Sequence, residues 1–308
     1  MRVVFSFSRH SVFFFWVSLE INILAVLPII GSAGNLTSRE RTLKYFITQR
    51  IASIIFLFLF LFSVSNFYPL STALAISIFF KIGIPPFHSW LTRIILFSPY
   101  KIIGLILFVQ KFIPLHIISN LIFSLKLLIF IILITAAIVL PTLKNILSLR
   151  ITIIISAWRN SIWIVMATVN SKIWIVFLLF YGIFLSLILS LLFTLNAQKF
   201  SSLLGISTPD KIVCMLIFIN LAGLPPFSGF FLKLLLLKNF LAWAPILIVI
   251  ALLNMSLIVL FAYLALTYYV ARSNFQAAPL RPVRSQYFLI ATRILILPGF
   301  PIFMSLTR

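Results

Sequence analysis

Two short stretches decide the fold of this chain: "FKIGIPPFHSW" at residues 80–90 and "LAGLPPFSGFFLK" at residues 221–233. Both contain Gly-x-Pro-Pro-Phe, and both lie in strongly apolar surroundings. Proline removes a backbone donor and clashes with the preceding turn, so tandem prolines interrupt or end a helix. Inside a bilayer, the carbonyls that lose their donors must be satisfied by protein, water or ions.

The two copies carry their charges on opposite sides of the motif. Lys81 lies two residues before the first glycine, whereas Lys233 lies ten residues after the second. Broken helices in corresponding places of two halves, with charges beside them, are typical of inverted-repeat transporters. The second motif lies well inside an apolar run, but Pro85 and Pro86 fit either a break or the end of a span.

Composition places the chain in the membrane. Of its 308 residues, 63% are hydrophobic and 9% charged, with a mean hydropathy of +1.24, against about 45–50% and 25% in soluble domains. We predict an all-α integral membrane protein with one transmembrane domain over 1–308. It would hold a first half-channel at 11–120, a second at 121–240 and C-terminal helices at 245–305. The apolar runs predict about ten spans: 11–31, 44–66, 72–91, 102–118, 121–143, 151–169, 173–196, 212–238, 245–271 and 285–305.

The net charge of +21 comes from 24 basic residues against three acids. The basic residues are scattered along the loops, which argues against nucleic-acid binding. In the ten-span arrangement the odd-numbered loops hold eleven of them and the even-numbered loops only Lys172 and Lys238, as the positive-inside rule requires. One cysteine and three distant histidines give no metal site, and no cofactor-binding motif is present. The basic N-terminus lacks a small-residue cleavage site, so we expect an unprocessed chain.

Four ionisable side chains lie deep inside predicted spans: Glu20, Lys81, Lys111 and Lys233. Each such group costs roughly 2.5–3.5 kcal/mol on insertion scales, so it is usually buried and paired. Glu20 alone fits a helix-locking ion pair, and any one lysine fits snorkelling to the interface. Four groups in separate helices favour a proton relay. His88 is a possible further carrier, although an interfacial histidine explains it equally well.

Five segments together resemble NADH dehydrogenase subunit 2, an antiporter-like membrane subunit of respiratory complex I. They are "SLEINILAVLPII", "TLKYFITQRIAS", "FFKIGIPPFHSWL", "FVQKFIPL" and "LAGLPPFSGFFLK", between residues 16 and 240. The resemblance implies that Glu20 pairs with Lys81, that Lys111 is the central lysine, and that Lys233 hands protons onward. It also identifies His88 as the histidine of the first motif.

One segment departs from the family pattern. Where the family commonly has "LRK" and "YSSIxHxGW", this chain has "LRITIIISAWRNSIW" at 149–163. Ile151 replaces a basic residue, Asn160 a histidine, and Arg159 a small or polar residue. The N-terminus is also short for the family, which together with ten spans favours a mitochondrially encoded animal protein.

The resemblance implies a proton-translocating subunit of NADH:ubiquinone oxidoreductase, multi-pass in the mitochondrial inner membrane. NADH, FMN, iron–sulfur clusters and ubiquinone would belong to other subunits. Subunits 4, 4L and 6, accessory subunits and phospholipids including cardiolipin would be its partners. Two other readings remain open at this stage: a stand-alone cation/proton antiporter, and a structural scaffold whose charges only lock helices.

Overall fold

The fold is all-helical, as the sequence predicts. The computed structural model describes residues 9–32, 34–61, 67–121, 125–142, 148–170, 173–195, 202, 208–224, 227–241 and 245–272. Its elements are α1 (Arg9–Gly31), α2 (Leu36–Leu61), α3 (Phe67–Ile82), α4 (Ser89–Phe97), α5 (Tyr100–Leu107), the 3-10 turn η1 (Val109–Lys111), α6 (Phe112–Asn120), α7 (Leu125–Thr142), α8 (Leu149–Asn170), α9 (Ile173–Thr194), α10 (Thr208–Ala222), α11 (Ser228–Leu241) and α12 (Ile246–Arg272).

Within these ranges, six helical segments are long and apolar enough to cross a membrane. Three shorter apolar helices lie at Ser71–Ile82, Lys126–Val139 and Lys211–Ala222. A multi-pass membrane protein is therefore confirmed, whereas the count of ten spans is not. The tenth predicted span, 285–305, and Arg293 within it lie outside the described residues.

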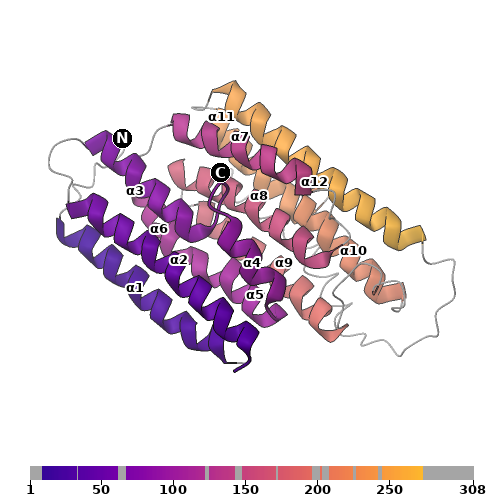
Figure 1. The fold of residues 1–308 in the computed structure, drawn as a ribbon. Helices are drawn as coiled ribbons and strands as arrows, with labels where there is room; N and C mark the ends of the chain where they lie inside the picture. Colours follow the sequence, from indigo (N-terminus) through magenta and orange to yellow (C-terminus); the bar gives the residue numbers. More distant parts are fainter. Residues whose placement is uncertain are drawn as a thin grey trace. The chain divides into compact units, whose positions relative to one another are not determined.

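The chain divides into two compact units, Met1–Ile134 and Thr135–Arg308, and the boundary falls inside α7. In the first unit α2 packs against α1, α3 and α4, while α6 packs against α1 and α3 (Figure 1). In the second unit α10 packs against α9, α11 and α12, and α8 packs against α9 and α12. The first unit contains the first Gly-x-Pro-Pro-Phe motif, and the range of the second unit contains the second.

Helix α2 begins eight residues before the predicted span, at Leu36 rather than at residue 44. Its first turns are polar, and the ten-span arrangement predicts a loop there. Arg41 is nevertheless buried, because its Nε donates to the carbonyl of Thr37 at 3.0 Å and its Nη1 to the Ser98 hydroxyl at 3.4 Å. These internal partners let a charged turn continue the helix.

Two of the predicted continuous spans are interrupted in the first unit. The tandem prolines break the third span: α3 ends at Ile82 and helix resumes with α4 at Ser89. The fourth is divided into α5, η1 and α6. Pro114 explains this irregularity, since it has no N–H for the carbonyl of Gln110 and disfavours a regular helix there.

Candidate functional site

The two Gly-x-Pro-Pro-Phe motifs end their helices with the same backbone geometry. Gly83 and Gly223 have φ angles of +75° and +79°, the left-handed region that favours glycine. At the first motif, the N–H groups of residues 83 and 84 both donate to the carbonyl of Phe79. At the second, those of residues 223 and 224 donate to the carbonyl of Ile219. The sequence repeat is therefore a repeat of local structure.

At the first break, neutral donors satisfy the helix end. Pro85 has no N–H for the carbonyl of Lys81, four residues earlier. The Gln49 side-chain amide, from α2, donates to that carbonyl at 3.2 Å. The indole N–H of Trp90, from α4, donates to the carbonyl of Phe80 at 3.1 Å. The donors to the carbonyls of Phe80 and Lys81 are thus both uncharged side chains.

At the second break, cations satisfy the helix end. By sequence, Pro225 and Pro226 have no N–H for the carbonyls of Leu221 and Ala222. The guanidinium of Arg159, from α8, donates to both carbonyls, with 3.4 Å between its Nη1 and the Ala222 oxygen. Lys233 Nζ, from α11, donates to the same Ala222 oxygen at 2.5 Å.

Arg159 and Lys233 therefore share one carbonyl and lie within electrostatic range of each other. The Arg159 guanidinium also lies over the ring of Tyr263, 5.7 Å from its centroid. Neither cation forms an ion pair with a carboxylate among the side chains that the structure describes. Asn220 completes this break, because its side-chain oxygen accepts the N–H of Gly229 at 2.9 Å and so caps α11.

Glu20 forms its ion pair with Arg50, a residue that sequence reasoning did not select. Arg50 Nη1 and Glu20 Oε2 lie 2.7 Å apart, in an ion-pair geometry rather than an aligned hydrogen bond. The Arg50 guanidinium also lies 5.2 Å from the centroid of the Phe46 ring, one turn earlier on α2. The carboxylate thus connects α1 to α2.

Lys81 lies within electrostatic range of both Glu20 and Arg50. Its side chain is 6% exposed, and its Nζ makes no hydrogen bond to a described residue. The expected proximity of Glu20 and Lys81 is therefore present, but the direct ion pair expected between them is not. Arg50 takes that place because it reaches the carboxylate from the middle of the adjoining helix.

Lys111 lies at the helix irregularity in the first unit, on η1, and is 2% exposed. Its neighbour Gln110 joins three elements: Gln110 and Asn22 of α1 exchange two amide hydrogen bonds of 3.0 and 3.2 Å. The Tyr45 hydroxyl, from α2, donates to the same Gln110 oxygen at 2.9 Å. These three polar side chains fix the turn that carries Lys111.

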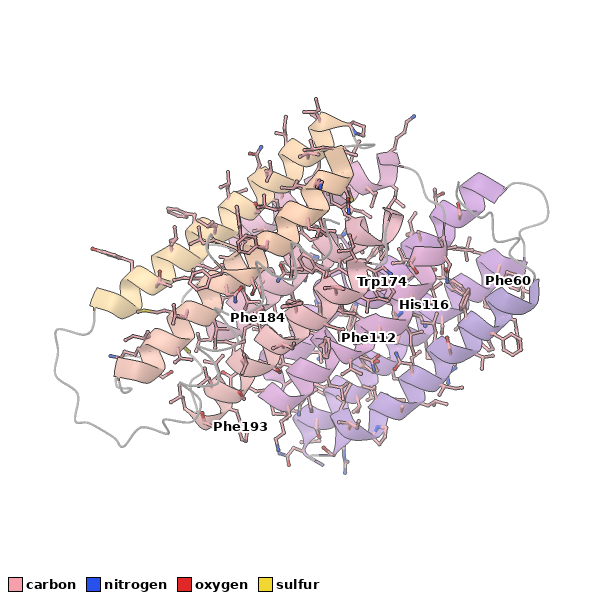
Figure 2. The ribbon with its side chains drawn as sticks, turned by 180° about the vertical axis from the view of Figure 1, so that it is seen from behind. Phe60, Phe112, His116, Trp174, Phe184 and Phe193 are labelled. Atoms are coloured by element: carbon pink, nitrogen blue, oxygen red, sulfur yellow. The ribbon has the colours of Figure 1, made fainter. Side chains whose placement is uncertain are left out.

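His88, the possible further carrier, and His116 lie at less buried places than the lysines. His88 sits inside the first break, with its ring Nδ1 3.1 Å from the Pro86 carbonyl, and stays a predicted rather than a demonstrated carrier. His116 is exposed on α6 (Figure 2). Its ring and that of Phe15 are in an edge-to-face arrangement, with 6.4 Å between the ring centroids.

Sequence reasoning missed Arg50 and considered Arg159 only as a departure from the family pattern. Each signal was available: a lone cation well inside an apolar span needs a counter-charge or backbone acceptors. Glu20 is the only acid in any predicted span, which pointed to a short list of partners for Arg50. The partners of Arg159 are main-chain carbonyls, and no residue type in the sequence marks those.

Comparison with known proteins gives relatives over most of the chain, although no protein-family model matches it. It is 32% identical over 278 residues to NADH-ubiquinone oxidoreductase chain 2 of Anopheles gambiae, covering 85% of this chain and 80% of that one. It is also 32% identical over 290 residues to the chain 2 protein of Myxine glutinosa, covering 88% and 82%.

Solved membrane complexes share the fold. A chain of respiratory complex I from Thermus thermophilus with bound aureothin matches with a TM-score of 0.71 at 20% identity, covering 94% of this chain and 71% of that one. A chain of the Mrp complex from Dietzia sp. matches with a TM-score of 0.66 at 17% identity, covering 83% and 56%. At these identities the likeness is one of fold. The sequence relatives go further, and on their evidence this chain belongs to the family of NADH-ubiquinone oxidoreductase chain 2.

Proposed function

We propose that this chain is a proton-translocating subunit in the membrane arm of an NADH:ubiquinone oxidoreductase. Glu20, Lys81, Lys111 and Lys233 would be its relay groups, with His88 as a further carrier. Redox chemistry in other subunits would change the pairing of Glu20, and the resulting proton transfers would run through Lys81 and Lys111 to Lys233. The first half-channel would lie in residues 11–120 and the second in 121–240.

The observation that carries this proposal is a set of buried lysines placed at helix irregularities. Lys81 precedes the first break, Lys111 lies on η1, and Lys233 donates to the broken end of α10. Such places are where irregular backbone at membrane depth is tolerated, because it lines protein or water rather than lipid. Lysine, unlike arginine, exchanges its proton readily when it is buried.

The surroundings of the chain belong to the same proposal. The chain would hold no redox centre, while NADH, FMN, iron–sulfur clusters and ubiquinone would be bound by other subunits. Its neighbours would be subunits 4, 4L and 6 with accessory subunits, and phospholipids including cardiolipin would fill the contacts with the bilayer. The membrane would be the mitochondrial inner membrane, with the basic loops in the matrix.

Replacing Lys233 by glutamine in the assembled complex tests the relay. We expect fewer protons pumped per NADH oxidised, because the last relay group can no longer accept a proton. The matched control is K238Q, which removes an exposed lysine from the same helix and should leave the ratio unchanged. An undiminished ratio in K233Q vesicles would count against the relay.

The likeness to a chain of the Mrp complex keeps one other function in view, a stand-alone cation/proton antiporter. Purification in mild detergent separates the two. A subunit of the oxidoreductase should run in a very large assembly that oxidises NADH, whereas an antiporter should run apart from that activity. A scaffold role would instead be indicated if K233Q, K111Q and K81Q all assembled and pumped normally.

A further inference from the structure

Arg50 is a half-buried cation, with 37% of its side chain exposed, and the proposed relay does not use it. It lies near the middle of α2, and its guanidinium is 2.7 Å from the Glu20 carboxylate. The Phe46 ring packs against the same guanidinium. Arginine stays protonated in proteins, so Arg50 does not itself accept and release a transferred proton. A permanent positive charge therefore lies beside Glu20, the one acid inside a span predicted from the sequence.

Glu20, Arg50 and Lys81 form a cluster of three charged groups whose net charge depends on Lys81. Glu20 and Arg50 contribute −1 and +1, so together they are neutral, and a protonated Lys81 raises the cluster to +1. Lys81 is buried and its ammonium has no hydrogen-bond partner among the described residues. Glu20 has one carboxylate to share between two cations that both lie within electrostatic range of it.

Two neighbouring residues of α2 contact the two other members of the cluster. Arg50 reaches Glu20 on α1, and Gln49 donates to the backbone carbonyl of Lys81 on α3 at 3.2 Å. Both groups of the cluster are therefore held by consecutive residues of one helix. A movement of α2 that loosens the Arg50 contact would also disturb the helix end that carries Lys81.

We propose that Arg50 is a positioning residue of the relay: it is the resting counter-ion of Glu20 and holds that carboxylate away from Lys81. The switch at the first break then has three charged groups. Glu20 bound to Arg50 is one arrangement, and Glu20 turned to Lys81 is the other. This inference rests on the proposed relay and adds to it Arg50, the residue with which Lys81 competes for the Glu20 carboxylate.

Vesicles containing the assembled complex test it, with three quantities measured: complex assembled, NADH oxidised and protons pumped per NADH. We expect R50Q to lower the proton ratio and R50K to restore most of it, because lysine supplies a cation at the same place. The matched control is K44Q, which removes the partner of Glu40 from an exposed pair of 3.3 Å on the same helix. K44Q should leave all three quantities unchanged.

If Arg50 only locks α1 to α2, R50Q will reduce the amount of assembled complex while each remaining complex pumps at the normal ratio. That result would overturn the proposal, and so would an R50K ratio no better than that of R50Q. If R50Q fails to assemble, the double variant E20Q/R50Q removes both charges and leaves no lone ion in the bilayer.

The double variant also measures whether the two residues act together. We expect its proton ratio to equal that of E20Q alone, since Arg50 acts through Glu20. A further loss, additive with that of E20Q, would show that Arg50 acts elsewhere and would overturn the proposal. A normal ratio in E20Q would instead overturn the relay itself, so the two failures are distinguishable.

Discussion

The two breaks have the same backbone and opposite chemistry at their helix ends. At the first, the amide of Gln49 and the indole of Trp90 occupy the free carbonyls. At the second, Arg159 and Lys233 occupy them. The charge of the first break is consequently free to interact with another charge, whereas the charges of the second are bound to the main chain.

The difference in charge follows from which neighbours each break has. The first has an acid nearby, and Glu20 with Arg50 forms an ion pair beside Lys81. Among the described side chains, the second break has two cations and no acidic ion-pair partner. Carbonyl oxygens and the ring of Tyr263 contact these cations instead. The same turn therefore lies beside a cluster of mixed charge at the first break and beside two cations that repel each other at the second.

The largest effect is expected from G223A. A non-glycine residue at this φ costs roughly 1–3 kcal/mol, and its Cβ would occupy the place of Lys233 Nζ. The midpoint of thermal unfolding of the full chain in mild detergent measures the loss. G34A is the control for strain alone, because its φ is +68° and nothing lies within 4 Å of the added Cβ. Equal losses in the two variants would mean that Lys233 moves aside freely.

G83A should fall between those two variants. Its φ of +75° gives similar strain, and its Cβ would meet the side chains of Leu91 and Trp90 at 3.1 Å, contacts that the neighbours can relieve by small shifts. The same unfolding experiment ranks the three glycines. A loss in G83A larger than that in G223A would show that the first break is the more tightly packed one.

The next effect distinguishes the donors at the second break. R159L leaves the Leu221 carbonyl without its donor, which costs about 1–3 kcal/mol for a buried group. R159Q keeps a neutral donor of the kind that Gln49 supplies at the first break. We expect R159Q to unfold at a higher temperature than R159L. If the two variants unfold together, water replaces the guanidinium at that carbonyl.

A smaller loss is expected from Q49L at the first break. It removes one neutral hydrogen bond to the Lys81 carbonyl, and leaving that carbonyl unpaired costs about 1–3 kcal/mol. Because the Trp90 indole still donates to the adjacent carbonyl, we place Q49L at the lower end of that range. The unfolding midpoint of Q49L, compared with that of R159L, tests whether a neutral donor contributes less than a charged one.

The smallest effect is expected from Y45F. The hydroxyl of Tyr45 donates one bond of 2.9 Å to Gln110, and such a bond contributes about 0.5–1.5 kcal/mol net. The Gln110–Asn22 amide pair remains in this variant, so the turn that carries Lys111 should keep its position. A loss beyond that range would show that Tyr45 supports more than this one bond.

The helix ends at the two Gly-x-Pro-Pro-Phe motifs were predicted from sequence because their cause is local. The division of the predicted span 102–118 into α5, η1 and α6 was not predicted, although Pro114 is a local cause of the same kind. The polar start of α2 could not be predicted as helix, because Arg41 has a partner across the fold, Ser98, as well as one along its own helix. Composition alone, in the same way, decided that the chain is a multi-pass membrane protein.

The sequence by itself determined that Glu20, Lys81, Lys111 and Lys233 are charges inside an apolar chain, since a charge at membrane depth is visible from its neighbours in sequence. Only the tertiary structure decided which groups they meet. Arg50 rather than Lys81 binds Glu20, and Arg159 joins Lys233 at one carbonyl. The reason is physical: ion pairs and carbonyl contacts depend on a few ångströms between helices, and helical periodicity in the sequence does not record that distance.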